Sequence, residues 1–472
     1  MAHVLISAAH KSSGKTTISI GLCAALRARG LAVQPFKKGP DYIDPMWLGQ
    51  AAGRPCYNLD YYTMQPEAIG ALFGHHSAHA DIAVIEGNKG LYDGLDLDGS
   101  NSNAALAKLL AAPVVLVIDA RGMTRGIAPL ILGYQAFDPD IRIAGVVLNQ
   151  LGGGRHESKL RAVIEHYTGV PVLGAVHRDP ALTIDERHLG LIPSNESREA
   201  GQLIETLGVR LAEQVDLDAL LDTAARATAP TFPEPPPAAS SGRAAPLRVG
   251  IVRDAAFGFY YPDDLDALLA QGTELVFIDA LRDRQLPALD ALFIGGGFPE
   301  THMDALAANV ELRGALRTAI EGGLPTYAEC GGLMYLSRSL HWQGRRADMV
   351  GVIPADAVMC ERPQGRGYVR LAPTGAGPWS DEPAEIAAHE FHYSRLENIS
   401  EPLIYAYRVL RGTGVDGEHD GIVLHNLLAN YTHLRHSLDN PWTQRFLDFA
   451  RRRSEVRATT SGDAPSGLAI TA

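Results

Sequence analysis

Cys330 has surroundings that are typical of a nucleophile. It follows the predicted strand 324–329 and precedes Gly331-Gly332 and the apolar, helix-like run 333–336. A strand that ends in a thiol and then turns sharply into a helix presents the sulfur at the turn, where the amide groups of the helix N-terminus favour thiolate over thiol. The sequence therefore predicts a reactive thiol at this position.

A cysteine nucleophile also needs a base and a group that stabilises the oxyanion of a tetrahedral intermediate. The glycine-rich segment 295–300 and the residue after the thiol can present backbone amides for this purpose. The candidate oxyanion groups are the amides of Gly296, Gly297 and Gly331. His433 is the candidate base. Sequence spacing alone does not exclude other histidines as the base, because a nucleophile and its base are brought together only by the fold. These competitors are His389, His392, His425 and His436.

The start of the chain carries a second reactive pattern, a phosphate loop. The segment Ser7-Ala-Ala-His-Lys-Ser-Ser-Gly-Lys-Thr-Thr17 follows the first predicted strand and opens the first predicted helix. In the complete G-x-x-x-x-G-K-S/T pattern the first glycine would stand at Ala9, so only the distal half of the motif is strict. The backbone of such a loop cradles phosphate, its lysine reaches the terminal phosphates and its hydroxyl holds Mg²⁺. The predicted nucleotide-binding residues are Ser12, Ser13, Gly14, Lys15, Thr16 and Thr17.

Acidic side chains follow two of the next predicted strands, in the segments 36–45 and 84–93. The carboxyl ends of parallel strands converge on the crevice where an open sheet binds ligands, and carboxylates there can bind Mg²⁺. The candidates for metal binding and substrate activation are Asp41, Glu86 and Asp93. We expect Glu86 to share the metal with Thr16. Asp44 fits a capped or solvated turn equally well.

The composition limits the class of protein. A chain of 472 residues with 46% apolar and 20% charged residues is typical of a soluble protein of two domains. The formal charge, 42 − 54 = −12, argues against a nucleic-acid partner. The N-terminus lacks the features of a signal peptide and no apolar run is long enough to cross a bilayer, so no membrane role is expected. The four cysteines lack metal-site or disulfide spacing, which favours a reducing cytoplasm.

The apolar runs predict an α/β fold. In the first half, short runs rich in Val and Ile alternate with helical stretches, as in a doubly wound parallel sheet that is covered by helices on both faces. The strands expected there are 3–9, 31–38, 81–87, 113–120, 142–150 and 171–176. A second α/β series, expected to form its own sheet, begins with strands at 247–254, 274–281, 291–297 and 325–329.

Changes in composition mark the domain boundaries. Residues 227–246 are rich in Pro and Ala and are predicted to form a solvated linker. This linker would separate a P-loop domain, residues 1–226, from a second domain, residues 247–452. The tail 453–472, rich in Ser, Thr, Ala and Gly, is predicted to be disordered.

Together these motifs resemble the cobyrinic acid a,c-diamide synthase family. The segments 328–332, 295–300 and 429–433 are similar to the class I glutamine amidotransferase domain of that family. Further segments look like those of the family in the same order, namely 39–45, 86–87, 90–94, 119–123, 186–190, 257–262 and 390–394. The resemblance covers about residues 3–445.

The resemblance implies a two-step amidation of a tetrapyrrole. The first domain, similar to dethiobiotin synthetase, would use ATP and Mg²⁺ to phosphorylate an acetate side chain. The second would hydrolyse glutamine through a Cys330 thioester, with His433 as base, and supply ammonia to the acyl phosphate. Carried over by position, substrate and intermediate are handled by Asp41, Tyr42 and Asp93. This branch of the family usually lacks the glutamate that completes the triad elsewhere, and Arg435 follows the base, so no third member is assigned.

Departures from the family pattern allow more than one tetrapyrrole macrocycle as the substrate. Ser12 replaces a glycine of the phosphate loop, Lys11 adds a cation to it, and Asn88-Lys89 replaces an apolar pair. The two lysines either alter the macrocycle that is accepted or are solvated surface charges. A siroheme amidase and a nickel-sirohydrochlorin diamide synthase are therefore alternatives within the family.

Two alternatives lie outside that reaction. A regulatory P-loop ATPase would share the first domain but would have no use for a glutaminase. A cobyric acid synthase shares both domain types, but the segment 39–45 speaks against it. The sequence is compatible with a homodimer and does not fix the oligomeric state.

Overall fold

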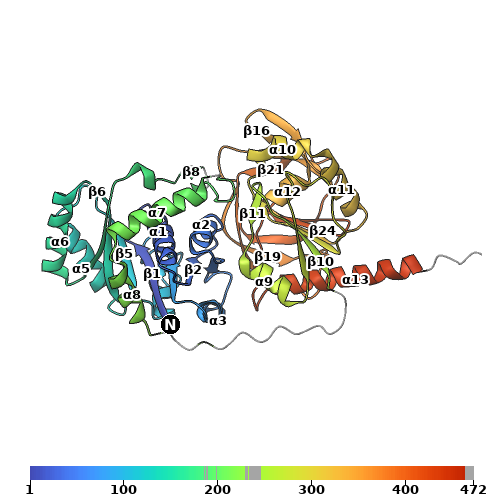
Figure 1. Cartoon of the computed structure of the whole chain (residues 1–472). Helices are drawn as coiled ribbons and strands as arrows, with labels where there is room; N and C mark the ends of the chain where they lie inside the picture. The colour runs from blue at the N-terminus through green and yellow to red at the C-terminus, as the bar shows by residue number, and fades with distance from the viewer. Residues whose placement is uncertain (185, 188–189, 198, 229–231, 233–245, 463–472) are drawn as a thin grey trace, which may run out of the picture. The chain divides into compact units, whose positions relative to one another are not determined.

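The computed structural model describes residues 1–184, 186–187, 190–197, 199–228, 232 and 246–462 (Figure 1). It divides between Pro236 and Pro237 into two compact units, each described here by itself. This division falls inside the segment that was predicted as the linker. Most of that segment, and part of the family-like segment 186–190, lie outside the described residues.

The first unit is built on a seven-stranded parallel sheet in the order β3-β2-β4-β1-β5-β6-β7. Its strands are β1 (Ala2–Ala8), β2 (Val33–Lys38), β3 (Tyr57–Leu59), β4 (Ile82–Glu86), β5 (Val114–Asp119), β6 (Ile143–Leu151) and β7 (Val172–His177). Most strand residues are buried, because helices cover the sheet, and this explains the unbroken apolar runs. The predicted doubly wound fold is confirmed. Among the strands of this sheet, the sequence missed the short strand β3. It also missed the two-stranded sheet of β8 (Glu186–Arg187) and β9 (Gly190–Leu191).

Helices connect these strands and follow the last of them. They are α1 (Lys15–Ala28), α2 (Ile43–Ala52), α3 (Pro66–Ser77), α4 (Asn103–Leu109), α5 (Ile127–Phe137), α6 (Gly154–Thr168), α7 (Ala200–Gln214) and α8 (Leu217–Ala225). Helices α1 and α7 lie side by side (Figure 1). Their close approach requires glycine, since a Cβ on Gly208 would stand 2.9 Å from the Cβ of Ala24. This close packing fixes α1 against α7.

One residue of the predicted linker packs against the core of the first unit. Phe232 packs so closely on α3 that a Cβ on Gly70 would stand 2.1 Å from its Cδ1. The expectation that segment 227–246 buries no apolar side chain is therefore wrong at this residue.

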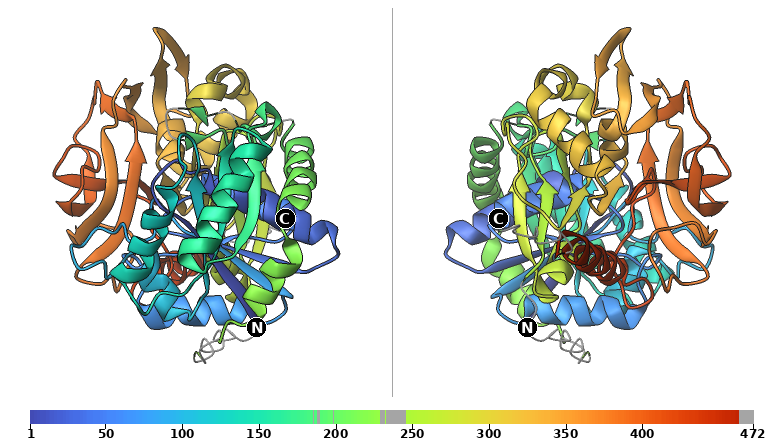
Figure 2. Two further views of the ribbon diagram at one scale, coloured as in Figure 1. Left: turned by 90° about the vertical axis from the view of Figure 1, so that its left-hand side faces the viewer. Right: turned by 90° about the vertical axis from the view of Figure 1, so that its right-hand side faces the viewer.

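The second unit is built on a nine-stranded mixed sheet in the order β12-β10-β13-β15-β24-β23-β22-β19-β20. Strands β10 (Arg248–Val252), β12 (Glu274–Ile278), β13 (Ala291–Ile294), β15 (Thr326–Glu329) and β24 (Leu427–Asn430) pair in parallel. Strands β23 (His419–Leu424), β22 (Ile404–Arg411), β19 (Gly365–Pro373) and β20 (Ile386–His392) continue the sheet antiparallel. Figure 2 shows these antiparallel strands, in orange and red, grouped on one side of the unit. The sequence predicted the first four parallel strands and missed the antiparallel extension.

Smaller elements complete the second unit. The pair β11 (Phe257–Phe259) and β14 (Gly296–Gly297) and the sheet of β16 (Ser337–Trp342), β17 (Arg345–Asp348), β18 (Ile353–Met359) and β21 (Ser394–Glu397) flank the main sheet. The helices are α9 (Pro262–Ala270), α10 (Met303–Ala308), α11 (Val310–Glu321), α12 (Gly331–Leu336) and α13 (Trp442–Gly462). Helix α13 continues past Arg453 to Gly462, so the prediction of a disordered tail is wrong for residues 453–462. Residues 463–472 of the predicted tail lie outside the described residues. Across the described residues, the helices include none with the length and apolar character needed to cross a membrane.

Candidate active sites

The phosphate loop lies between β1 and α1 and is fixed by contacts to neighbouring strands. Gly14 adopts the left-handed region with φ 86°, and a Cβ there would stand 2.1 Å from Nδ2 of Asn149. Asn149, on β6, donates to the carbonyl of Ser13 at 2.9 Å. The Ser13 hydroxyl donates to the carbonyl of His10 at 2.8 Å, and Ser12 is also left-handed, with φ 65°. The loop therefore has one defined backbone path, in which Gly14 cannot be replaced without a clash.

A cluster of charged side chains lies next to the first turn of α1. The Thr16 hydroxyl is 2.7 Å from Oε1 of Glu86 and 3.3 Å from Oδ2 of Asp44. The Lys37 ammonium is 2.5 Å from Oδ2 of Asp44, 3.0 Å from Oε1 of Glu86 and 3.7 Å from Oδ2 of Asp41. Lys37 and Glu86 are register partners at the carboxyl ends of β2 and β4. These five side chains form what we call the carboxylate cluster.

Burial and mutual charge set the protonation of the carboxylate cluster. Burial raises the pKa of Asp41 to about 7, the charge of Asp44 adds to the rise and Lys37 opposes it. For Asp44, burial also raises the pKa, but the ammonium of Lys37 and its hydrogen bond outweigh burial and lower the pKa. Burial lowers the pKa of Lys37, whereas Asp44 and Glu86 raise it well above its ordinary value. Lys37 and Asp44 are thus an ion pair, and Asp41 can exchange a proton near neutral pH.

The remaining predicted residues of the first site border this cluster. Lys15 is 8% exposed, and burial lowers its pKa while the charge of Glu86 raises it. Tyr42 is buried immediately before α2, and Thr17 is half-buried on α1. Asp93 is exposed in the loop after β4 and accepts from the amide of Gly90 at 2.8 Å. That loop meets the phosphate loop, because Leu91 donates to the carbonyl of Ala8 at 2.8 Å.

Sequence reasoning missed three residues of this site. It assigned no role to Lys37 or Asn149, and it gave Asp44 an equal chance of being a solvated turn. The signal that could have identified Lys37 is a lysine at the fifth position of a buried strand, followed by two aspartates. A buried ammonium requires carboxylate partners.

The second site is a turn between β15 and α12. Cys330 has φ 47° and ψ −99°, and its amide donates to the carbonyl of Asn430 on β24 at 2.7 Å. A Cβ on Gly332 would stand 2.3 Å from the carbonyl oxygen of Ile294, so the turn also requires a glycine there. The strained backbone at the thiol is the geometry of a nucleophile elbow.

The protonation of Cys330 differs from the sequence prediction. Burial raises the pKa of the thiol, and the charges of Glu300 and Glu329 add to the rise, whereas the amide of Gly331 lowers it. Helix α12 spans only Gly331–Leu336, so its dipole is too small to overcome burial. The prediction that Cys330 is a thiolate is therefore wrong for the free protein, and a base must remove the proton from the thiol.

The predicted oxyanion groups lie together beside the thiol. A Cβ on Gly331 would stand 2.9 Å from the amide nitrogen of Gly297, so these two backbones are in contact. A Cβ on Gly296 would stand 2.6 Å from Cε1 of His433, which brings the imidazole to the same place. The structure thus brings together the glycines and the histidine that the sequence could associate only by hypothesis.

His433 is held by hydrogen bonds from several elements. Its Nδ1 is 3.2 Å from Oε2 of Glu329, and its amide donates to the carbonyl of His389 at 2.8 Å. The rings of His433 and His389 stack with centroids 4.9 Å apart. Sequence reasoning missed Glu329, although it is the residue immediately before the thiol.

The competing histidines have other environments. Burial, together with the charges of His433 and Arg435, lowers the pKa of His389 well below its ordinary value. His392 is 2.8 Å from the carbonyl of Ser394 and stacks on a tyrosine. His425 lies in an exposed turn and His436 is 2.7 Å from the Thr443 hydroxyl. Among these histidines, the geometry favours His433 as base.

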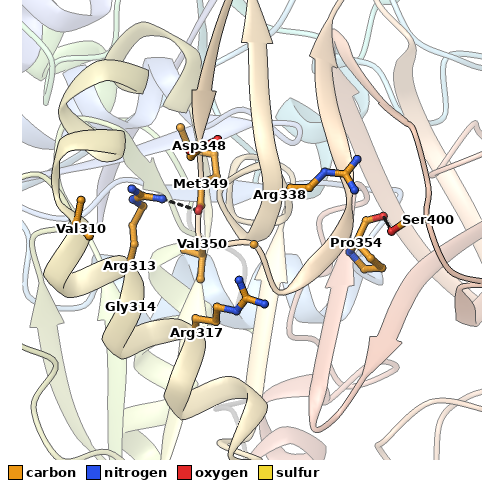
Figure 3. A pocket seen from close by; sticks show the side chains of 11 residues that line it. Val310, Arg313, Gly314, Arg317, Arg338, Asp348, Met349, Val350, Pro354 and Ser400 are labelled. Atoms are coloured by element: carbon orange, nitrogen blue, oxygen red, sulfur yellow. Dashed lines mark hydrogen bonds between the residues drawn. The ribbon is translucent and has the colours of Figure 1, made fainter.

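The second unit also contains a cavity of about 550 Å³, and Figure 3 shows the side chains that line it. Its lining includes Arg313, Arg317 and Arg338 but none of the residues of the thiol site. Arg313 donates to the carbonyl of Met349 at 2.8 Å, and Arg338 is paired with Asp356 at 2.8 Å. These guanidinium groups already serve the fold, so the cavity is not a candidate for the glutamine site.

Cysteines and acidic residues give no sign of a preformed metal centre within the described ranges. All four cysteines, Cys23, Cys56, Cys330 and Cys360, are free thiols. In that part of the chain, no three side chains of the His, Cys, Asp and Glu types are grouped to hold a metal ion.

Both units of the chain match known protein families. Residues 5–192 match the model of the CobQ/CobB/MinD/ParA nucleotide binding domain, and residues 248–441 match that of the CobB/CobQ-like glutamine amidotransferase domain. A cobyrinate a,c-diamide synthase of Magnetococcus marinus is 48% identical over 95% of this chain and 97% of its own. Those of Methanosarcina acetivorans and Listeria monocytogenes are 43% and 39% identical, over 91% and 92% of this chain and 92% and 96% of their own. With such relatives over nearly its whole length, the chain belongs to the cobyrinate a,c-diamide synthase family.

Proposed function

We propose that the protein is a carbon-nitrogen ligase that uses ATP and glutamine to amidate acetate carboxylates of a tetrapyrrole, in the manner of a cobyrinate a,c-diamide synthase. The observation that carries the proposal is the presence in one chain of two sites: the phosphate loop with its carboxylate cluster, and the Cys330 elbow with His433. One site activates a carboxylate and the other releases ammonia. We place the protein in the reducing cytoplasm, where its free thiols persist.

The first site activates the substrate carboxylate by phosphorylation. A carboxylate is a poor electrophile until one of its oxygens becomes a good leaving group, and ATP supplies the phosphoryl group for this. Lys15 and Lys37 place two ammonium groups beside the transferring phosphate, where negative charge must be balanced. Asp41, whose pKa lies at about 7, accepts a proton from the ammonia nitrogen as the amide forms. Tyr42 and Asp93 border the same crevice and contact the substrate.

The residues at Thr16 fit a magnesium ion. Magnesium prefers oxygen ligands and is commonly held by one or two carboxylates together with phosphates, and Thr16 and Glu86 supply oxygens beside the phosphate loop. Oε2 of Glu86 is buried and has no hydrogen-bond partner among the described residues, so it can serve as a ligand. A bound Mg²⁺ would neutralise phosphate charge.

The second site hydrolyses glutamine. The Cys330 thiol gives its proton to His433 as sulfur attacks the carboxamide carbon, and the amides of Gly296, Gly297 and Gly331 stabilise the oxyanion. The proton leaves with ammonia, and water then hydrolyses the thioester to glutamate and the free thiol. The released ammonia attacks the acyl phosphate, and phosphate departs.

Lys38 is placed to bind a further carboxylate of the substrate. Its side chain lies at the end of β2, is only 6% exposed, and within the described residues donates its hydrogen bond to Oδ1 of Asn88 at 3.3 Å. Burial lowers the pKa of Lys38 to about 8; the carboxylate of Asp60 opposes this fall and the ammonium of Lys89 adds to it. A buried ammonium is stabilised by an anion, and a peripheral carboxylate of the macrocycle would supply one.

We therefore expect Lys38→Met to raise KM for the tetrapyrrole by about tenfold, because one charge-assisted hydrogen bond is lost. KM for ATP and for glutamine should stay within about twofold of the wild type. Steady-state kinetics with each substrate varied in turn would measure this. Lys159→Met, at an exposed position on α6, is the matched control. An unchanged KM for the macrocycle would show that Lys38 does not contact it.

Product analysis tests the proposed function and separates the alternatives. The protein would be incubated with ATP, Mg²⁺ and glutamine and with cobyrinic acid, sirohydrochlorin, nickel-sirohydrochlorin or siroheme in turn. We expect a product of cobyrinic acid that carries two carboxamides in place of two carboxylates, detected by mass spectrometry. Amidation of siroheme or nickel-sirohydrochlorin alone would assign the protein to the corresponding alternative. ATP turnover without amidation of any macrocycle would indicate a regulatory ATPase.

A further inference from the structure

Glu329 is positioned to act on His433. It is the last residue of β15, directly before Cys330, and its side chain is 2% exposed. Its Oε2 lies 3.2 Å from Nδ1 of His433. Its Oε1 accepts two hydrogen bonds, from the Tyr327 hydroxyl at 2.6 Å and from the amide of Leu434 at 2.9 Å. The carboxylate is therefore held at both oxygens, with one of them directed at the imidazole.

We propose that Glu329 is the positioning residue that completes a Cys330–His433–Glu329 triad. This inference rests on the proposed glutaminase site and deepens it. A carboxylate at Nδ1 keeps the proton of a neutral imidazole on that nitrogen, so Nε2 becomes the basic nitrogen for the thiol. It also stabilises the imidazolium that forms when the thiol proton moves to Nε2.

The register of the sheet explains how a residue adjacent to the nucleophile can hold its base. Glu329 and Asn430 are register partners in the parallel pair β15–β24, and Asn430 stands three residues before the base. Leu434, which donates to Glu329, directly follows the base. Successive strand residues point to opposite faces, but Cys330 lies beyond the strand in a left-handed turn, so sulfur and carboxylate can both face the imidazole.

Arg435 cannot take this role, although it stands two residues after the base. Its guanidinium carries only hydrogen-bond donors, and Nδ1 of His433 needs an acceptor if Nε2 is the base. Arg435 is instead bound to Asp263 at 2.8 Å, and its guanidinium lies 4.7 Å from the ring centroid of Tyr261. The carboxylate from β15 thus occupies the place of a third triad member.

The test uses Glu329→Gln in the full-length protein. The glutamine side chain can keep its oxygen toward Tyr327 and Leu434 while its NH₂ donates to Nδ1, which moves the imidazole proton to Nε2. We expect kcat for glutamine-dependent amidation to fall about 10- to 100-fold, KM for glutamine to stay within about threefold, and ammonia-dependent amidation to stay within about twofold. Glu329→Asp should restore part of the lost activity. Tyr327→Phe, which removes a hydrogen bond to the same carboxylate but none to the imidazole, is the matched control.

Two readouts distinguish positioning from a merely structural role. Imidazole ¹⁵N chemical shifts of His433 should show the proton on Nδ1 in the wild type and on Nε2 in Glu329→Gln, and alkylation of Cys330 by iodoacetamide should slow by a similar factor to kcat. Unchanged shifts and alkylation, or equal losses with glutamine and ammonia, would overturn the proposal. The shifts and alkylation need no tetrapyrrole, so they decide the role of Glu329 even if the macrocycle assay fails. Wild-type protein that does not hydrolyse glutamine at all would count against the proposed function instead.

Discussion

Cys330→Ser should reduce glutamine-dependent amidation by about 10³-fold or more, because the thioester can no longer form at a useful rate. Amidation with a high concentration of ammonium should continue at close to the wild-type rate, since the phosphate loop and the carboxylate cluster belong to the other unit. Both rates would be measured by mass spectrometry of the macrocycle. The same samples would be assayed for glutamate release.

The matched control is Cys360→Ser, which changes a half-exposed free thiol of the same unit and should leave both activities intact. The variant should therefore lose glutamine-dependent amidation and keep ammonia-dependent amidation. Simultaneous loss of the glutamine- and ammonia-dependent activities in Cys330→Ser, with the melting temperature unchanged, would show that the thiol is not confined to ammonia release.

Lys15→Ala should reduce amidation from either nitrogen source by about 10²- to 10³-fold, because a cation beside the transferring phosphoryl group is lost. Glutamate release from glutamine should persist, since it depends on the Cys330 site. Thermal unfolding should change little, because burial already disfavours the Lys15 ammonium, as its lowered pKa indicates. Rates with ammonium and with glutamine, measured beside glutamate release, would test this.

Lys159→Ala on α6 is the control for loss of a lysine from the first unit, and its rates should equal those of the wild type. Undiminished amidation by Lys15→Ala would contradict the phosphoryl-transfer role of the loop. Loss of glutamate release together with synthesis would contradict the assignment of glutamine hydrolysis to the second unit.

The parallel strands of both units could be predicted because burial on two faces leaves unbroken apolar runs. Strand β5 is an example, with a run of five buried residues that no polar residue interrupts. The antiparallel strands were missed for the opposite reason. In β19, buried and exposed residues alternate irregularly, and Arg366 and Arg370 lie exposed within it, so the segment resembles a loop. Its place in the sheet depends on partners that are distant in sequence.

The reactive residues could be predicted where a local sequence motif defines them. They could not be predicted where the fold brings together residues that are distant in sequence. The turn at Cys330 and the loop at Gly14 have local signatures, since glycines and the reactive side chains are neighbours in sequence. The contacts of Lys37 with Glu86 and of Glu329 with His433 join residues on different elements. Only the pairing of β2 with β4, and of β15 with β24, brings these side chains together.

Burial of the Cys330 thiol bears on the durability of the protein. Peroxides oxidise thiolates far faster than thiols, and burial together with two neighbouring carboxylates keeps this sulfur protonated. A nucleophile that is ionised only when its base and its substrate are in place is shielded from sulfenic acid formation between turnovers. The burial that keeps the Cys330 thiol protonated until catalysis therefore also protects it from oxidation.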